Sequence, residues 1–151
     1  YHNPEIIPAF REYFALFKEL LKIYPGQEVH FEPGRSLVAQ CGSLISRVLY
    51  IKNGDTSTFA VIDAGMNDLI RPALYQAYHK IENITSEGSK AFYNVVGPVC
   101  ESADIFGKQV ELPETTRGDI IAIRSVGAYG ESMASRYNLR DLAPSYFSDR
   151  L

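Results

Sequence analysis

The chain has 151 residues, which is enough for one domain with a sizeable hydrophobic core. Its net charge of −3 excludes the basic surface that nucleic-acid-binding proteins present, and no apolar run approaches the length that crosses a membrane. Two cysteines, Cys41 and Cys100, do not make a disulfide framework. They indicate a reducing compartment, and we expect a cytoplasmic protein.

The clearest predicted element is a helix over residues 8–24. Its aromatic and aliphatic residues recur at intervals of three and four, which gives one wide apolar face. Pro8 suits the first turn, Pro25-Gly26 ends the helix, and a strand-like run over residues 28–31 follows. A helix and a strand make half of a β/α unit, which cannot bury its own apolar face. We therefore expect its packing neighbours to be missing from this chain or to come from another chain.

After Arg35 the pattern changes to short strands bounded by turn residues. Residues 37–41 predict one helical turn, and Asn53-Gly54-Asp55 predicts a hairpin. Residues 68–78 are helix-like, with a length limited by Pro72. Many short strands predict an antiparallel sandwich or barrel. The expected strands are residues 44–52 (with Ile45, Val48 and Tyr50 as the alternating positions), 58–63, 80–85, 90–96, 108–112 and 119–126.

The segment Glu32-Pro33-Gly34-Arg35 closes the strand-like run and is the first candidate site. In β/α barrels the carboxyl ends of the strands carry the functional groups. Glu32 can keep a pyridine nitrogen protonated, and Arg35 can bind a phosphate or carboxylate with two parallel hydrogen bonds. Gly34 lets backbone N–H groups approach an anion. The alternative is a surface turn with a local ion pair.

The second candidate is Gly97-Pro98-Val99-Cys100-Glu101-Ser102, where a predicted strand changes into a polar loop. A thiol on such a loop can donate a proton to a carbanion, which makes Cys100 a candidate catalytic residue. Glu101 can bind a cationic substrate group. The alternatives are a small buried cysteine and a solvated loop acid. Cys41 has no such setting and is interpreted as structural.

Three more side chains can bind anionic groups. Arg71 and Tyr75 are four residues apart, so one helical face can present a guanidinium and a phenol to a carboxylate. Tyr129, in Gly127-Ala128-Tyr129-Gly130, can donate its hydroxyl proton to a phosphate oxygen. The alternatives are an exposed arginine with a half-buried tyrosine, and a core tyrosine. The histidines show no metal-ligand spacing, so no metal site is predicted.

In this order the three motifs EPGR, GPVCES and GAYG resemble the diaminopimelate decarboxylases, pyridoxal-phosphate enzymes of the alanine-racemase-like class (fold type III). The resemblance runs to about Asn138 and covers the C-terminal part of the family's length. It implies a mainly β fold, with a Greek-key β-sandwich or barrel domain over residues 36–151. A helix–strand remnant of a β/α (TIM-like) barrel over residues 1–35 would precede it. The Cys-Glu-Ser triplet, with the Arg71/Tyr75 segment, separates the chain from the ornithine decarboxylases, which carry Cys-Asp-Gly there.

The resemblance also implies roles, in an enzyme that converts meso-2,6-diaminopimelate to L-lysine and CO2. Cys100 would be the proton donor. Pyridoxal phosphate would be bound by Glu32, Pro33, Gly34, Arg35 and Tyr129, and the amino-acid substrate by Arg35, Arg71, Tyr75, Glu101 and Tyr129. In the family, the residues that correspond to Cys100 and Glu101 reach into the site of the partner subunit. The resemblance therefore implies a homodimer with shared active sites.

The family's cofactor-binding lysine, catalytic histidine and glycine-rich phosphate loop belong to its earlier part, and nothing here matches them. The start at Tyr1, without an initiator methionine, is interpreted as a cut, so we expect the chain alone to be inactive. Two alternatives stay open. One is a related decarboxylase of arginine, ornithine or a carboxylated polyamine, and the other is a non-catalytic dimerisation or binding module.

Overall fold

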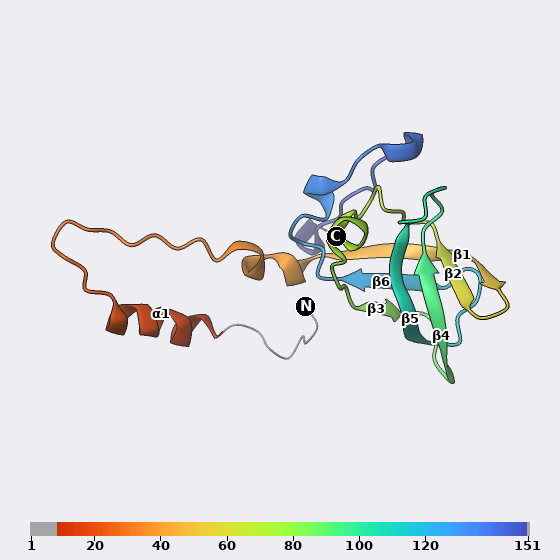
Figure 1. The fold of residues 1–151 in the computed structure, drawn as a ribbon, viewed down its shortest axis with the longest axis horizontal. Coiled ribbons are helices and arrows are strands. Elements are labelled where there is room, and N and C mark those ends of the chain that lie inside the picture. Colours follow the sequence, from red (N-terminus) through yellow and green to blue (C-terminus); the bar gives the residue numbers. More distant parts are fainter. Residues whose placement is uncertain (1–8, 151) are drawn as a thin grey trace.

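A six-stranded sheet dominates the protein, and its strands lie where the sequence predicts them (Figure 1). The computed structural model describes residues 9–150. Each strand predicted after residue 36 is present, with small shifts at its ends. The strands are β1 (Ser43–Asn53), β2 (Thr58–Ile62), β3 (Ile81–Asn83), β4 (Lys90–Val96), β5 (Ile105–Pro113) and β6 (Ile120–Arg124).

The sheet has the strand order β3-β6-β1-β2-β4-β5. β2 and β4 run parallel, and the other neighbouring pairs are antiparallel. The two edge strands, β3 and β5, contact each other, and the Ile81 side chain lies 3.1 Å from the place that a Cβ atom would occupy at Gly107. The sheet is therefore a nearly closed barrel, which confirms the mainly β fold.

Inward-facing aliphatic side chains fill the barrel. The largest fully buried ones in the core cluster are Ile62, Leu69, Leu112, Ile121 and Ile123. They come from β2, β5, β6 and the segment after β2, so the core joins residues far apart in the sequence. Burying each such side chain contributes about 1.5–3 kcal/mol, which makes this cluster the main source of stability in the barrel.

The inward face of β1 differs from the predicted one. Val48 is buried, but Ile45 is 55% exposed and Tyr50 is 50% exposed, so the prediction that the three residues alternate on one face is wrong. Ile45 and Val48 are an odd number of residues apart, which places them on opposite faces. A bulge between Val48 and Tyr50 then shifts the alternation, so that Ile51 is the next partly buried residue packed against the core.

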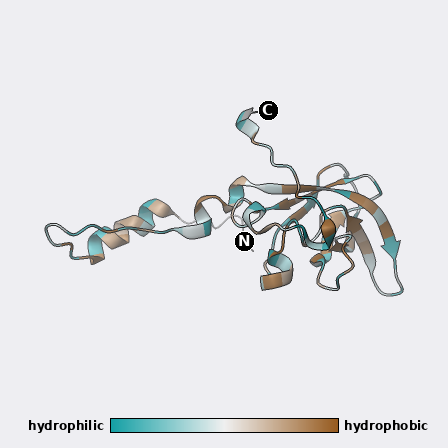
Figure 2. Ribbon diagram, turned by 90° about the horizontal axis from the view of Figure 1, so that it is seen from above, coloured by the Kyte–Doolittle hydropathy of each residue, from teal (hydrophilic) through white to brown (hydrophobic). Residues whose placement is uncertain are grey.

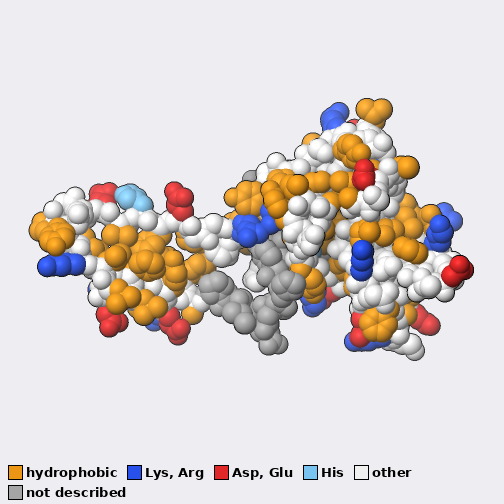
Figure 3. All heavy atoms as spheres, viewed as in Figure 1, with side chains coloured by type: hydrophobic (Ala, Val, Ile, Leu, Met, Phe, Trp, Pro, Cys, Tyr) orange, Lys and Arg blue, Asp and Glu red, His pale blue; other side chains and the backbone are white. Residues whose placement is uncertain are grey.

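Residues 9–41, which we call the arm, project from the barrel (Figure 1). The arm begins with α1 (Phe10–Leu20) and returns along it toward the barrel. The ring of Phe31 packs edge-on against Phe14 and Phe17, with centroids 4.8 and 5.0 Å apart. No residue of α1 is buried, and hydrophobic side chains gather on its visible face (Figure 3). The same contrast between apolar arm and filled barrel is visible from above (Figure 2).

Two predictions about the arm need correction. The helix ends at Leu20 rather than at residue 24, with Leu21 already extended, and its predicted start at Pro8 lies outside the described residues. Residues 28–31 form no strand. A strand needs a neighbour to accept its hydrogen bonds, and among the described residues no strand lies beside this segment. The division at residue 35 into a barrel remnant and a β domain stays a prediction.

Short helical turns connect the arm to the sheet and β2 to β3. The turn predicted over residues 37–41 is present as two 3₁₀ turns, η1 (Gly34–Leu37) and η2 (Ala39–Cys41). The helix predicted over residues 68–78 is confined to α2 (Arg71–Tyr75), because Pro72 opens it and Gln76 ends it in a left-handed conformation with φ of 53°. Within residues 9–150, no helix is both long and apolar enough to cross a lipid bilayer.

Candidate functional site

Three of the predicted site residues meet at one place. Arg71, at the start of α2, is 7% exposed, and its guanidinium carbon lies 5.3 Å from the ring centre of Tyr75 and 5.8 Å from that of Tyr129. Both rings are about half exposed. We call these residues the arginine–tyrosine cluster. The spacing of Arg71 and Tyr75 predicted their pairing, whereas Tyr129 reaches them only through the fold.

The Arg71 guanidinium is available for an anion. None of the ion pairs within the described residues includes Arg71. A buried guanidinium without a carboxylate partner is costly, and two aromatic faces compensate for only part of that cost. The cluster therefore has the chemistry of a carboxylate or phosphate site, with two phenol groups that can donate further hydrogen bonds.

His79 lies within electrostatic reach of Arg71 and is itself 3% exposed. Its Nδ1–H donates to the carbonyl oxygen of Arg124 at 2.9 Å. Burial lowers the pKa of His79 below its ordinary value of 6.5, the bond to Arg124 opposes this shift, and the positive charge of Arg71 adds to it. His79 is therefore neutral at pH 7 and does not compete with Arg71 for an anion.

The loop that carries Tyr129 is held by close backbone contact with the end of the arm. The N–H of Gly127 donates to the carbonyl of Ala39 at 2.9 Å. A Cβ atom on Gly127 would lie 2.1 Å from the carbonyl oxygen of Val38, so only glycine fits. Tyr129 itself has a φ of 60°, which costs a non-glycine residue about 1 kcal/mol. The strained backbone and the close contact together fix where its ring lies.

The segment from Glu32 to Arg35 lies directly before that contact. Gly34 has a φ of 64° and begins η1, and the Ser36 hydroxyl donates to the carbonyl of Pro33 at 2.6 Å. Glu32 and Arg35 are both exposed. The η1 turn thus brings this motif within a few residues of the Gly127 contact, so two of the three motifs are joined through the backbone.

Cys100 and Glu101 lie apart from the arginine–tyrosine cluster within one chain. Both side chains are exposed on the loop between β4 and β5. A carboxylate oxygen of Glu101 accepts a hydrogen bond from the Ser102 hydroxyl at 3.2 Å. The sulfur is accessible, as a proton donor must be.

Sequence reasoning missed one residue of this region, Asp104. It is 3% exposed, and its two carboxylate oxygens accept the N–H groups of Met66 and Val99, each at 2.7 Å. Burial raises the pKa of Asp104 above its ordinary value of 3.8, while these two hydrogen bonds act to lower it. An acid directly before an apolar strand was the available signal, because such a carboxylate is well placed to bond the N–H groups of adjoining loops.

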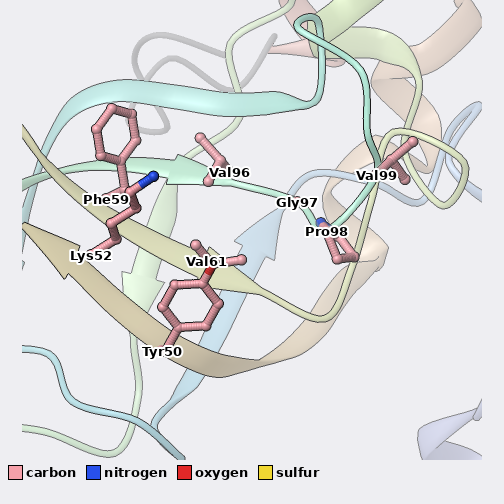
Figure 4. A pocket seen from close by; sticks show the side chains of 8 residues that line it. All are labelled: Tyr50, Lys52, Phe59, Val61, Val96, Gly97, Pro98 and Val99. Carbon is pink, nitrogen blue, oxygen red and sulfur yellow. The ribbon is translucent and has the colours of Figure 1, made fainter. Parts of the chain in front are cut away.

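A groove of 280 Å³ lies on the outer side of the sheet, lined by β1, β2, β4 and the start of the Cys100 loop (Figure 4). Its residues are Tyr50, Lys52, Phe59, Val61, Val96, Gly97, Pro98 and Val99. None of the predicted catalytic, cofactor-binding or substrate-binding residues lines it, and Lys52 is its single charged side chain. The arginine–tyrosine cluster, rather than this groove, is the candidate site.

Residues 20–127 match the family described as "Pyridoxal-dependent decarboxylase, C-terminal sheet domain". The chain belongs to this family. Over 149 residues it is 60% identical to the diaminopimelate decarboxylase of Bacteroides thetaiotaomicron, covering 99% of this chain and 39% of that protein. Pyridoxal-dependent decarboxylases are thus the established context of the cluster.

Two solved structures of diaminopimelate decarboxylases, each complexed with L-lysine, resemble this pyridoxal-dependent decarboxylase domain. The one from M. jannaschii has a TM-score of 0.76 and 42% identity, covering 89% of this chain and 30% of that chain. The one from Helicobacter pylori has a TM-score of 0.68 and 54% identity, covering 74% and 28%. The chain spans 39% or less of the length of these relatives.

The residues of the cluster fit part of what pyridoxal phosphate or an amino-acid substrate requires. Arg71 offers a buried positive charge to an anionic group, and the exposed hydroxyls of Tyr75 and Tyr129 can donate to its oxygens. Within residues 9–150 no three metal-ligating side chains gather, so the described part of the decarboxylase domain holds no metal cluster of that size.

Proposed function

We propose that the complete protein is a pyridoxal-phosphate-dependent decarboxylase that converts meso-2,6-diaminopimelate to L-lysine and CO2. The observation that carries this proposal is the buried Arg71 guanidinium between Tyr75 and Tyr129, in a chain 60% identical to a diaminopimelate decarboxylase. Diaminopimelate has a second amino-acid head group at its far end. A buried guanidinium with flanking phenols suits the carboxylate of that head group.

Each residue has a defined task in this reaction. Arg71 and Tyr75 hold the distal carboxylate of the substrate, and Glu101 binds the distal ammonium group. Tyr129 donates a hydrogen bond to the cofactor phosphate and lies beside the substrate. The segment Glu32-Pro33-Gly34-Arg35 lines the cofactor, with Glu32 facing the pyridine nitrogen and Arg35 also contacting the substrate.

When bound, pyridoxal phosphate accepts the electron pair left behind as CO2 departs. Cys100 then delivers the thiol proton to the carbon atom that has lost CO2. Glu32, as a carboxylate, stabilises positive charge on the pyridine nitrogen and so favours that electron flow. Because the distal groups are held by buried polar residues, a substrate that lacks them leaves those residues unpaired and is rejected.

The site is completed by a second copy of the chain. Cys100 and Glu101 are exposed on a loop apart from the arginine–tyrosine cluster of their own chain, so they are free to enter another copy's site. We propose a homodimer in which each copy supplies its Cys100 loop to its partner. We also propose a cytoplasmic location, in keeping with two cysteines that form no disulfide.

The test is CO2 release by the complete protein, supplied with pyridoxal phosphate, from diaminopimelate, ornithine and arginine in parallel. We expect release from diaminopimelate alone. Efficient release from ornithine or arginine with none from diaminopimelate would overturn the substrate assignment in favour of a related decarboxylase. A protein with no release from any of them would instead be a binding or dimerisation module.

A second measurement concerns the 151-residue chain by itself. We propose that it is inactive, because none of its lysines matches the family's cofactor-binding lysine. Borohydride reduction after mixing with pyridoxal phosphate should leave every lysine unmodified, as mass spectrometry of the peptides would show. A trapped cofactor on a single lysine would contradict this.

A further inference from the structure

One buried carboxylate joins the loop that carries Cys100 to the turn that precedes Arg71. Asp104 lies at the end of that loop, and one of its carboxylate oxygens accepts the Val99 N–H from the loop itself. The other accepts the Met66 N–H from the turn over residues 64–69. Both distances are 2.7 Å, and the Asp104 side chain is almost completely buried.

The backbone around Asp104 leaves no room for it to move. The N–H of Gly97 donates to the Asp104 carbonyl at 3.0 Å, and the Asp104 N–H donates to the carbonyl of Glu101, also at 3.0 Å. A Cβ atom on Gly97 would lie 2.3 Å from the Asp104 carboxylate. The glycine of the GPVCES motif is therefore required for this carboxylate to reach its position.

The turn on the other side is equally constrained. A Cβ atom on Gly65 would lie 2.9 Å from the Val99 side chain, so the turn and the loop are in direct contact. The Asp68 carboxylate accepts the Gly65 N–H at 2.8 Å and closes the turn. Leu69, which is 1% exposed, anchors the next residues in the core, and Arg71 follows two positions later. A shift at Met66 is thus passed on to Arg71 through a short, tightly packed segment.

We propose that Asp104 is a positioning residue: its carboxylate fixes the Cys100–Glu101 loop relative to the turn that sets Arg71. This inference rests on the proposed function, because it assigns the two segments to substrate binding and proton delivery. Removing the carboxylate leaves the buried N–H groups of Met66 and Val99 without acceptors, so the two segments separate to reach water. In the homodimer proposed above, each copy would then present a misplaced thiol to its partner and a misplaced guanidinium to its own substrate.

The test compares Asp104→Asn with Asp119→Asn in the complete protein. Asn retains one acceptor oxygen but turns an NH2 group toward an N–H donor, so one of the two bonds fails. Asp119 is a matched control at the opposite end of β6, where its Oδ2 accepts from the Thr116 N–H, the Asn83 amide and the Ser86 hydroxyl. Both variants therefore lose a carboxylate that joins loops, but only Asp104 lies between the proposed functional segments.

We expect Asp104→Asn to lower kcat/KM for diaminopimelate by about 100-fold, as misplacement of reacting groups by about 1 Å does. The KM for diaminopimelate, which does not depend on the amount of folded enzyme, should rise by at least about fivefold as part of that loss. Asp119→Asn should stay within about twofold of the wild type in both constants. An Asp104→Asn variant with unchanged KM and kcat, or an Asp119→Asn variant with the same losses, would overturn the proposal.

Asp104→Glu provides a second variant if Asp104→Asn fails to fold. It keeps the charge and both acceptor oxygens but adds one methylene where Gly97 leaves no space, so the two segments shift without losing their hydrogen bonds. We expect a loss in kcat/KM of about tenfold, smaller than for Asp104→Asn. Wild-type constants for Asp104→Glu would overturn the positioning role.

Hydrogen exchange separates this inference from the proposed function. The Met66 and Val99 amides should be protected in the wild type and should exchange at least about tenfold faster in Asp104→Asn, but not in Asp119→Asn. If the wild type releases no CO2 from diaminopimelate and this exchange result still holds, the proposed function fails while the connection between the loops stands. Unchanged exchange at both amides in Asp104→Asn would overturn the connection itself.

Discussion

The barrel and the arm carry equally clear sequence patterns but differ in how they are stabilised. In the barrel, apolar residues of six strands meet in one cluster from which water is excluded. In the arm, α1 has no buried residue, and Leu20 is 76% exposed. An amphipathic pattern predicts which face a helix will bury, but burial itself requires a second surface. The barrel supplies that surface from its own strands, whereas the arm presents an apolar face that is available for packing against another surface.

The largest expected effect is in the barrel core. Ile121→Ala removes a fully buried side chain of β6 and should lower the free energy of unfolding by about 2–5 kcal/mol. Leu20→Ala in α1 removes an exposed side chain and should change it by less than about 0.5 kcal/mol. Urea unfolding of the two variants and the wild type measures both values. Equal losses would show that the arm is packed as tightly as the barrel.

The second prediction concerns the site. Arg71→Met removes a buried guanidinium that pairs with no carboxylate among the described residues, so the stability of the barrel should stay within about 1 kcal/mol of the wild type. In the complete protein the same change should raise the KM for diaminopimelate by about 100-fold, because a charge-assisted bidentate bond is lost. Steady-state kinetics and thermal unfolding together test it. A KM that matches the wild type would remove Arg71 from the substrate site.

The third prediction is a pH dependence that belongs to the barrel alone. Burial lowers the pKa of His79 below 6.5, so below that pH the unfolded chain binds a proton that the folded chain does not. Stability should therefore fall as pH falls from 6.5 through the lowered pKa, and His79→Gln should flatten this slope. The exposed His30 of the arm offers the control, because His30→Gln should leave the slope in place. Urea unfolding at pH 7.5 and 5.5 decides between them.

The smallest expected effect lies on the barrel surface. Hydrogen bonds from Lys80 and Arg124 lower the pKa of Glu82, so its contribution to stability is present above pH 4.5 and is lost as pH falls through the lowered pKa. Because the group is partly exposed, Glu82→Gln should cost less than about 1 kcal/mol at pH 7. Glu19→Gln in the arm should cost nothing measurable. Thermal unfolding at pH 7 and pH 3 compares the two, and a cost above that of a core variant would contradict the ranking.

The sequence by itself determined the strands and the pairing of Arg71 with Tyr75. Alternating apolar residues and turn residues act over a few neighbours, so each strand after residue 36 could be predicted. A spacing of four residues places two side chains on one helical face whatever the rest of the chain does. The order of the three motifs was also sufficient to indicate the family that the comparisons establish.

The tertiary structure alone decided the features that depend on a distant partner. Residues 28–31 have the composition of a strand, but they form none because no neighbouring strand accepts their hydrogen bonds within the described residues. Tyr129 joins Arg71 across more than fifty residues of sequence because Gly127 packs against Val38. Asp104 reads as an ordinary loop acid until the fold brings Met66 to its carboxylate. Local periodicity carries no information about such contacts, since each is formed by two segments that meet only in the folded chain.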